Sequence, residues 1–137
     1  MHRKVLLWGL VLSGLAVMLG AFGAHALKNL VPANEVAIFE TGVRYQFIHA
    51  LALISLSIYM QVNASIINRQ KGMGWIASFF LLGILCFSGS LYLLTFQSMC
   101  SFPYAKIIGP ITPIGGLLLI FGWANWVKLV WIHKVDK

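Results

Sequence analysis

The chain is organised around the stretch FETGVRYQFIH, which runs from Phe39 to His49. It gathers more polar side chains than its surroundings, in a protein that is 60% hydrophobic and only 9% charged. The same stretch leads directly into an uncharged apolar run, so its polar groups stand at the entrance to a hydrophobic segment. As a helix, it would place Glu40 and Arg44 on one face, because residues four apart are neighbours on a helix surface.

The overall composition excludes an ordinary water-soluble domain. The 137 residues suffice for one domain, and their mean hydropathy is +0.88. Soluble domains carry about 25% charged residues, so this chain has too little charge to cover a surface in water. The net charge of +7 comes from basic residues scattered between apolar runs, a pattern that fits lipid headgroups and argues against nucleic acid. The lipid bilayer is therefore the expected partner.

Four apolar segments are long enough to cross a membrane, which takes about 20 residues as a helix. We predict an all-α integral membrane protein, a four-helix bundle forming one domain over residues 1–137. The four transmembrane helices are expected at about residues 5–24, 43–62, 75–96 and 107–130. A short interfacial helix is expected before the second span, with Gly42 as a hinge. Pro113 is expected to kink the fourth helix or to free a carbonyl.

The first span invites comparison with a cleaved signal peptide, because a basic head and an apolar run precede the sequence Ala24-His25-Ala26. The uncharged run over residues 5–22 is longer than the usual apolar core of about 7–15 residues in such peptides. It also carries small residues at helical spacing, which let membrane helices approach closely. These features favour an uncleaved first helix.

The distribution of basic residues predicts the orientation in the membrane. With four spans, both termini lie on one side, together with the loop between the second and third spans. That side holds Arg3, Lys4, Arg69, Lys71, Lys128, Lys134 and Lys137. The other side holds Lys28, Arg44 and Lys106, offset by Glu35 and Glu40. Because cytoplasmic loops are rich in Lys and Arg, we expect both termini in the cytoplasm.

Four sequence motifs occur in order along the chain. They are GAFGAHAL (20–27), FETGVRYQ (39–46) followed by HALAL (49–53), FSGSLY (87–92), and GPITPIGG (109–116) followed by Gly122-Trp123. Together they resemble the small bacterial inner-membrane proteins of the domain of unknown function 423 family, which also has a small eukaryotic relative. The resemblance implies a multi-pass protein of the bacterial plasma (inner) membrane with four helices, and it implies no particular activity.

The predicted topology brings the polar residues of all four motifs to a similar depth, near the non-cytoplasmic face. Polar groups inside a membrane bundle are candidates for a functional site. We expect a polar pocket, with Glu40 paired to Arg44 and with a neutral His49. The candidate pocket residues are His25, Glu40, Arg44, Tyr45, Gln46, His49, Ser88, Ser90, Tyr92 and Thr112. The expected helix-packing residues are Gly20, Ala24, Gly89, Gly115 and Gly116, with Ala16 on the same stripe as Gly20 and Ala24.

Several kinds of chemistry find little support in the sequence. His25 and His49 could ligate haem or a metal, but neither has a Cys or carboxylate beside it, so we expect no metal and no cofactor. A nucleophile–base pair of Ser88 and His49 lacks an orienting acid, so we expect no enzyme. Two classes of function stay open. The preferred one is a structural or accessory membrane component, self-associating or attached to a larger complex. The alternative is a pathway for small solutes, ions or protons, which would need a homo-oligomer.

Overall fold

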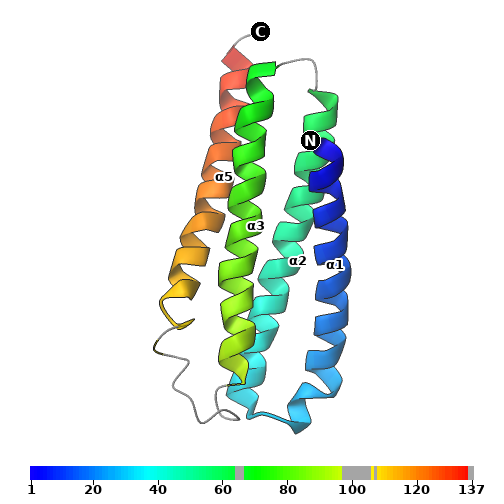
Figure 1. The fold of residues 1–137 in the computed structure, drawn as a ribbon, viewed down its shortest axis with the longest axis vertical. Coiled ribbons are helices and arrows are strands. Elements are labelled where there is room, and N and C mark those ends of the chain that lie inside the picture. The colour runs from blue at the N-terminus through cyan, green and yellow to red at the C-terminus, as the bar shows by residue number, and fades with distance from the viewer. Residues whose placement is uncertain (64–66, 97–105, 107, 136–137) are drawn as a thin grey trace.

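The computed structural model describes residues 1–63, 67–96, 106 and 108–135, with the side chains of 67–71 and 133–135 left out of the description. Four long helices make up this part of the chain: α1 (His2–His25), α2 (Ala33–Val62), α3 (Ile67–Thr95) and α5 (Ile111–Val135), with a short 3₁₀ turn, η1 (Leu27–Asn29), between the first two. Each long helix contains a stretch long and apolar enough to cross a membrane. The predicted all-α fold with four membrane-spanning helices is confirmed (Figure 1).

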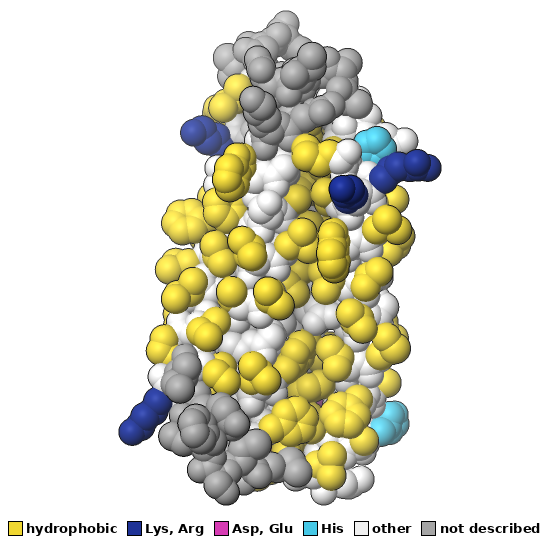
Figure 2. Space-filling view, viewed as in Figure 1, with side chains coloured by type: hydrophobic (Ala, Val, Ile, Leu, Met, Phe, Trp, Pro, Cys, Tyr) yellow, Lys and Arg dark blue, Asp and Glu magenta, His cyan; other side chains and the backbone are white. Residues whose placement is uncertain are grey.

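The helices α2 and α3 lie at the centre and the other two lie at the flanks. α1 packs on α2, α2 packs on α3, and α5 packs on α3. α1 begins and α5 ends at the same end of the bundle (Figure 1). In their most apolar windows, α1 and α5 are each only 17% buried, against 44% for α2 and 39% for α3. Figure 2 shows the result, which is a broad apolar surface between two ends that carry Lys, Arg and His.

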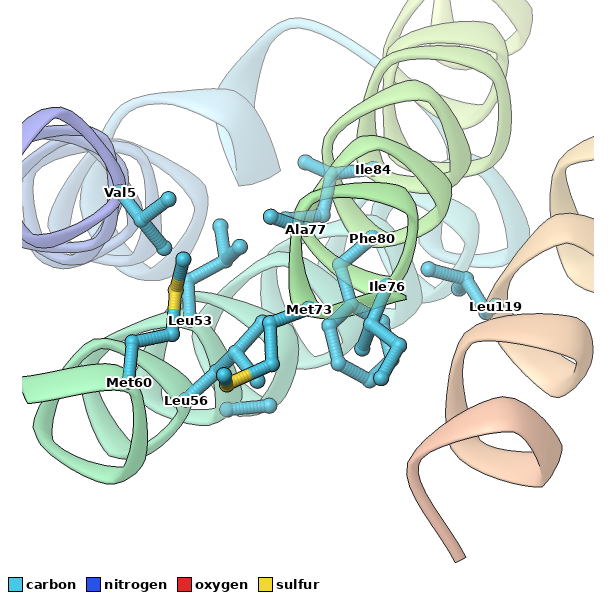
Figure 3. Packing of buried hydrophobic residues seen from close by; sticks show 11 residues of the cluster. Val5, Leu53, Leu56, Met60, Met73, Ile76, Ala77, Phe80, Ile84 and Leu119 are labelled. Atoms are coloured by element: carbon cyan, nitrogen blue, oxygen red, sulfur yellow. The ribbon is translucent and has the colours of Figure 1, made fainter. Parts of the chain in front are cut away.

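The main core lies between α2 and α3 and reaches to the flanking helices (Figure 3). Its largest fully buried members include Leu53, Leu56, Met73, Ile76 and Phe80. A smaller cluster at the other end joins η1 and the start of α2; it consists of Leu27, Val31, Val36 and Phe39. Since lipid tails are as apolar as these side chains, close packing rather than escape from water must hold the helices together.

Small residues on α1 permit its close approach to α2. A Cβ atom added at Gly9 would lie 2.7 Å from Ile54 Cγ1, and one at Gly23 would lie 3.1 Å from the ring of Phe39. Ala16, midway between these two glycines, is buried. The expected stripe of Ala16, Gly20 and Ala24 differs from this one, because Gly20 has only ordinary clearance from Val43 and Ala24 is exposed.

Another close approach joins α5 to α3 at Gly115. A Cβ atom at this position would lie 2.7 Å from the Cα atom of Phe87, which is a backbone atom that cannot move aside. The neighbouring Gly116 faces the ring of Phe87, and a Cβ atom there would make an ordinary contact of 3.6 Å. Gly89 has no atom within 4 Å of its Cβ position, so no contact within the described chain requires a glycine there.

The prediction of a separate interfacial helix before the second span is wrong, because α2 is one continuous helix from Ala33 to Val62. Gly42 serves close packing instead of a hinge: a Cβ atom there would lie 2.8 Å from the ring of Tyr92. At a rise of about 1.5 Å per residue, the 30 residues of α2 make a helix longer than the hydrocarbon core of about 30 Å, so part of α2 extends beyond that core.

Two other helix ends differ from expectation. α3 begins at Ile67 rather than near Trp75. α5 begins at Ile111, which makes Pro113 a first-turn residue. The N–H groups of a first turn have no partner within the helix, so a proline there removes no hydrogen bond and causes no kink. The loop expected from Gln97 lies largely outside the described residues, as do the side chains of Arg69, Lys71, Lys134 and Lys137.

The α3–α5 contact predicts unequal effects of two adjacent substitutions. Gly115→Ala should lower the stability of the bundle by roughly 1–3 kcal/mol, because the added methyl group overpacks against the Phe87 backbone. Gly116→Ala is the matched control and should be neutral or slightly stabilising, since alanine favours a helix more than glycine does. Thermal unfolding in detergent measures both. Equal stabilities for the two variants would contradict the close approach at Gly115.

Candidate functional site: polar contacts inside the bundle

The side chain of Gln46 joins three helices. It projects from α2 and is 4% exposed. Its Nε2 atom donates a hydrogen bond of 2.9 Å to the carbonyl oxygen of Leu12 on α1. Its Oε1 atom accepts a hydrogen bond of 2.9 Å from the hydroxyl of Tyr92 on α3. An amide side chain can both donate and accept, so one residue ties both neighbouring helices to α2.

His49 joins α2 to α5. Trp123 Nε1 donates to His49 Nε2 over 3.1 Å, and His49 Nδ1 lies 2.7 Å from the carbonyl oxygen of Tyr45, one turn earlier on α2. Because an indole N–H can only donate, Nε2 must be the unprotonated nitrogen. Nδ1 then carries the proton and donates it to the Tyr45 carbonyl. His49 is therefore neutral in this arrangement, with both ring nitrogens engaged.

Hydroxyl groups make two further links between helices. Ser90 on α3 and Thr112 on α5 lie with their oxygens 2.7 Å apart, and the Ser90 hydroxyl is also within 2.9 Å of the Phe87 carbonyl. Ser57 on α2 donates to the carbonyl of His2 on α1 over 2.9 Å. Ser88 is fully buried, and the structure gives its hydroxyl no hydrogen-bond partner.

The structure distributes the predicted pocket residues over separate places. Glu40 and Arg44 are exposed and line a shallow groove of about 280 Å³ between α1 and α2. Although both side chains are described, the structure records no ion pair between them. His25 is exposed at the end of α1. His49 points into the α2–α5 contact, about 15 Å further along α2 than Phe39, at 1.5 Å per residue.

The helical periodicity explains why no single pocket collects these residues. Phe39 packs near the α1 end that carries His25, whereas His49 belongs to a deeper level. Glu40 and Arg44 share an outward face, whereas Gln46 and His49 share the face that points inward. The expected single polar pocket and the expected Glu40–Arg44 pair are therefore not found among the described residues.

Two partners of these polar groups were not candidates from the sequence. The Leu12 carbonyl gives no signal, because it belongs to an apolar residue within a helix. Trp123 belongs to the fourth sequence motif but was not among the expected pocket residues, and its indole N–H bonds His49. The only sequence signal for Trp123 was its place next to Gly122 in the fourth motif. Tyr45 contributes its backbone to His49, and its 40% exposed ring lies against Phe87, with centroids 4.5 Å apart.

An apolar groove of about 450 Å³ lies beside the Gln46 junction, between α1 and α3. Its lining includes Trp8, Leu12, Gln46, Leu85, Gly89 and Tyr92. Two of its polar side chains, Gln46 and Tyr92, are already bonded to each other, and Gln46 is also bonded to Leu12. Nowhere in the described part of the chain do three His, Cys, Asp or Glu side chains gather as metal ligands would. The arrangement joins helices, and it offers no evident reactive group.

The Gln46 junction predicts coupled effects on stability. Tyr92→Phe removes one hydrogen bond, and Gln46→Leu removes two, so Gln46→Leu should cost more. Each hydrogen bond inside a membrane bundle contributes roughly 0.6–1.7 kcal/mol. In a double-mutant cycle measured by unfolding in detergent, the two substitutions should be non-additive by about 1 kcal/mol. Strict additivity would show that the Tyr92–Gln46 bond is absent in solution.

Comparisons with known proteins agree with this picture of a small membrane protein. A family model described as protein of unknown function (DUF423) matches residues 19–116. A UPF0382 membrane protein of Staphylococcus saprophyticus is 40% identical over 109 residues, which cover 80% of this chain and 81% of the relative. The UPF0382 membrane protein YwdK of Bacillus subtilis is 36% identical over 121 residues, covering 88% and 90% of the two chains.

The UPF0382 inner membrane protein YgdD of Escherichia coli is 35% identical over 122 residues, covering 89% of this chain and 85% of the relative. No solved structure matches the chain. The region that the family model matches includes Gln46, His49, Tyr92 and Gly115, whereas Leu12 precedes it. The chain therefore belongs to the DUF423 family, whose curated relatives are named UPF0382 membrane proteins.

Proposed function

We propose that the protein is a non-enzymatic accessory component of the membrane, a preassembled helical block that attaches to other membrane components. The main support is that the polar side chains inside the bundle bond to neighbouring helices. Gln46, His49 and Ser90 each bond to a partner on a neighbouring helix. A solute or ion needs polar groups that are free to bind it, and the bonds of these three side chains are already used to join helices.

The outer surfaces of the bundle supply a place for attachment. Val17 on α1 and Ile120 on α5 are each 62% exposed, and the helices that carry them each pack closely on only one other helix. These two flanks are the proposed contacts with a larger membrane complex or a second copy of the chain. We also propose that both termini face the cytoplasm. Support comes from the cations Arg3, Lys4 and Lys128, which lie towards the two termini, because cytoplasmic segments are rich in Lys and Arg.

A flux measurement separates the accessory role from the pathway alternative. Purified protein reconstituted into liposomes that contain a pH-sensitive dye should show no proton flux above protein-free liposomes under an imposed membrane potential. The control variant is His49→Phe, which removes the buried ionisable group and should behave like the wild type. A proton flux in the wild type that disappears in His49→Phe would overturn the accessory proposal in favour of a proton pathway.

Photo-crosslinking in cells tests attachment directly. A photoreactive residue at Val17 or Ile120 should capture another membrane protein or a second copy of the chain. The same residue at Leu53, which is fully buried, is the control and should capture neither. Products with lipid alone at both exposed positions would contradict attachment through these flanks.

A further inference from the structure

The apolar groove between α1 and α3 lies alongside the Gln46 junction, within the membrane-spanning part of the bundle. Trp8 and Leu12 form its α1 wall, and Leu85, Gly89 and Tyr92 belong to its α3 wall. Leu85 is 69% exposed, so the α3 wall is open to the surroundings of the protein. A groove at this depth meets the hydrocarbon tails of the bilayer.

The chemistry of the groove selects an apolar occupant. Among the described residues of its lining, polar atoms belong to Gln46, Tyr92 and the indole N–H of Trp8, and those of Gln46 and Tyr92 are engaged in the junction. A polar solute would lose its hydration here and would gain few hydrogen bonds in return. An alkyl chain has no hydration to lose, and it gains dispersion contacts with the two walls of the groove.

Gly89 is an independent sign of an occupant. Glycine weakens a helix interior relative to alanine, so a glycine there needs a reason. Gly42 and Gly115 have one, since another helix fills the space that a Cβ atom would take. Gly89 meets nothing within 4 Å, although it lines the groove. Something outside the chain that lies against α3 would account for the missing side chain.

A cation, Lys4, lies on α1 just outside the groove lining. Lys4 precedes Trp8 by one helical turn, about 6 Å along the axis towards the N-terminal end of α1. Lys4 and Trp8 together line a shallow hollow of about 270 Å³, so Trp8 borders both this hollow and the groove. The described carboxylates, Glu35 and Glu40, belong to the opposite end of α2, where they do not neutralise Lys4. The charge suits an anionic group at the level of the lipid headgroups.

We propose that this groove binds one acyl chain of an anionic phospholipid, from the leaflet that meets the N-terminal end of α1, with the lipid phosphate at Lys4. The chain lies along Trp8, Leu12 and Leu85 and passes over Gly89. The binding site goes beyond the accessory role, because it requires no protein partner.

Gly89→Leu is the decisive variant, since its Cβ atom would meet no atom of the described chain within 4 Å and its side chain would occupy part of the groove. Gly14→Leu is the matched control, because Gly14 is equally open at its Cβ position and lies outside the groove lining. Delipidated protein would be titrated with phosphatidylglycerol and, separately, with phosphatidylcholine, and bound lipid counted by native mass spectrometry. Gly89→Leu should weaken phosphatidylglycerol binding by about tenfold, and Gly14→Leu should leave it unchanged. Leu85→Trp narrows the same groove and should act like Gly89→Leu.

The headgroup contact has its own variant. Lys4→Gln should reduce the preference for phosphatidylglycerol over phosphatidylcholine by about fivefold, the effect of one charge near an anionic surface. Lys128→Gln, at a cation outside the hollow, should keep the preference. Unchanged lipid binding in both Gly89→Leu and Leu85→Trp would overturn the proposal. A changed oligomeric state with unchanged lipid binding would also overturn it, because the groove would then hold a second copy of the chain.

Discussion

The arrangement of the bundle depends on one glutamine side chain between three helices. The hydrocarbon core offers no water to satisfy polar groups, so each must find a partner inside the protein. Gln46 bonds the Leu12 carbonyl with one end of its amide and the Tyr92 hydroxyl with the other. Both distances are 2.9 Å, which leaves little freedom for α1 or α3 to slide along α2. Polar contacts of this kind fix the position of one helix along another, whereas apolar packing alone would allow several positions.

Close backbone approach makes these polar contacts reachable. Gly42, one turn before Gln46, leaves room for the ring of Tyr92, whose hydroxyl then reaches the amide. Gly115 lets α5 approach α3 closely. Trp123, further along α5, then bonds His49 on α2. Glycine and polar side chains thus act together, because lipid provides no hydrophobic force to press the helices together. The outer faces of α1 and α5 do not pack against another helix of the described chain, and they carry large apolar residues.

Sequence patterns predict the number of helices well, since the thickness of the hydrocarbon core sets a length that four apolar runs satisfy. They also pointed to Gln46, His49 and Tyr92 as polar residues inside the bundle. They did not show which neighbour each face meets, because that depends on helix rotation, which a single chain does not encode locally. Glu40 and Arg44 were therefore assigned to the same pocket as His49, although they lie on an outward face.

Helix ends were equally hard to predict from local signals. Gly42 suggested a hinge, but its role is set by Tyr92 on another helix. Pro113 suggested a kink, but its effect depends on the start of α5 at Ile111. Trp123 stands in the fourth sequence motif, but its bond to His49 follows only from the three-dimensional packing of α5. In each case the residue type was informative, and the partner that decides its role lay far away in the sequence.

Buried polar side chains bond directly across the helices of this bundle, and the protonation state of His49 tests this arrangement most directly. In lipid bilayers at neutral pH, ¹⁵N NMR of histidine-labelled protein should show His49 with a protonated Nδ1 and an unprotonated, hydrogen-bonded Nε2. Trp123→Phe should shift the Nε2 resonance, because its donor is lost. A His49 that is doubly protonated, or that carries its proton on Nε2 and ignores the Trp123 substitution, would contradict the direct bond between α2 and α5.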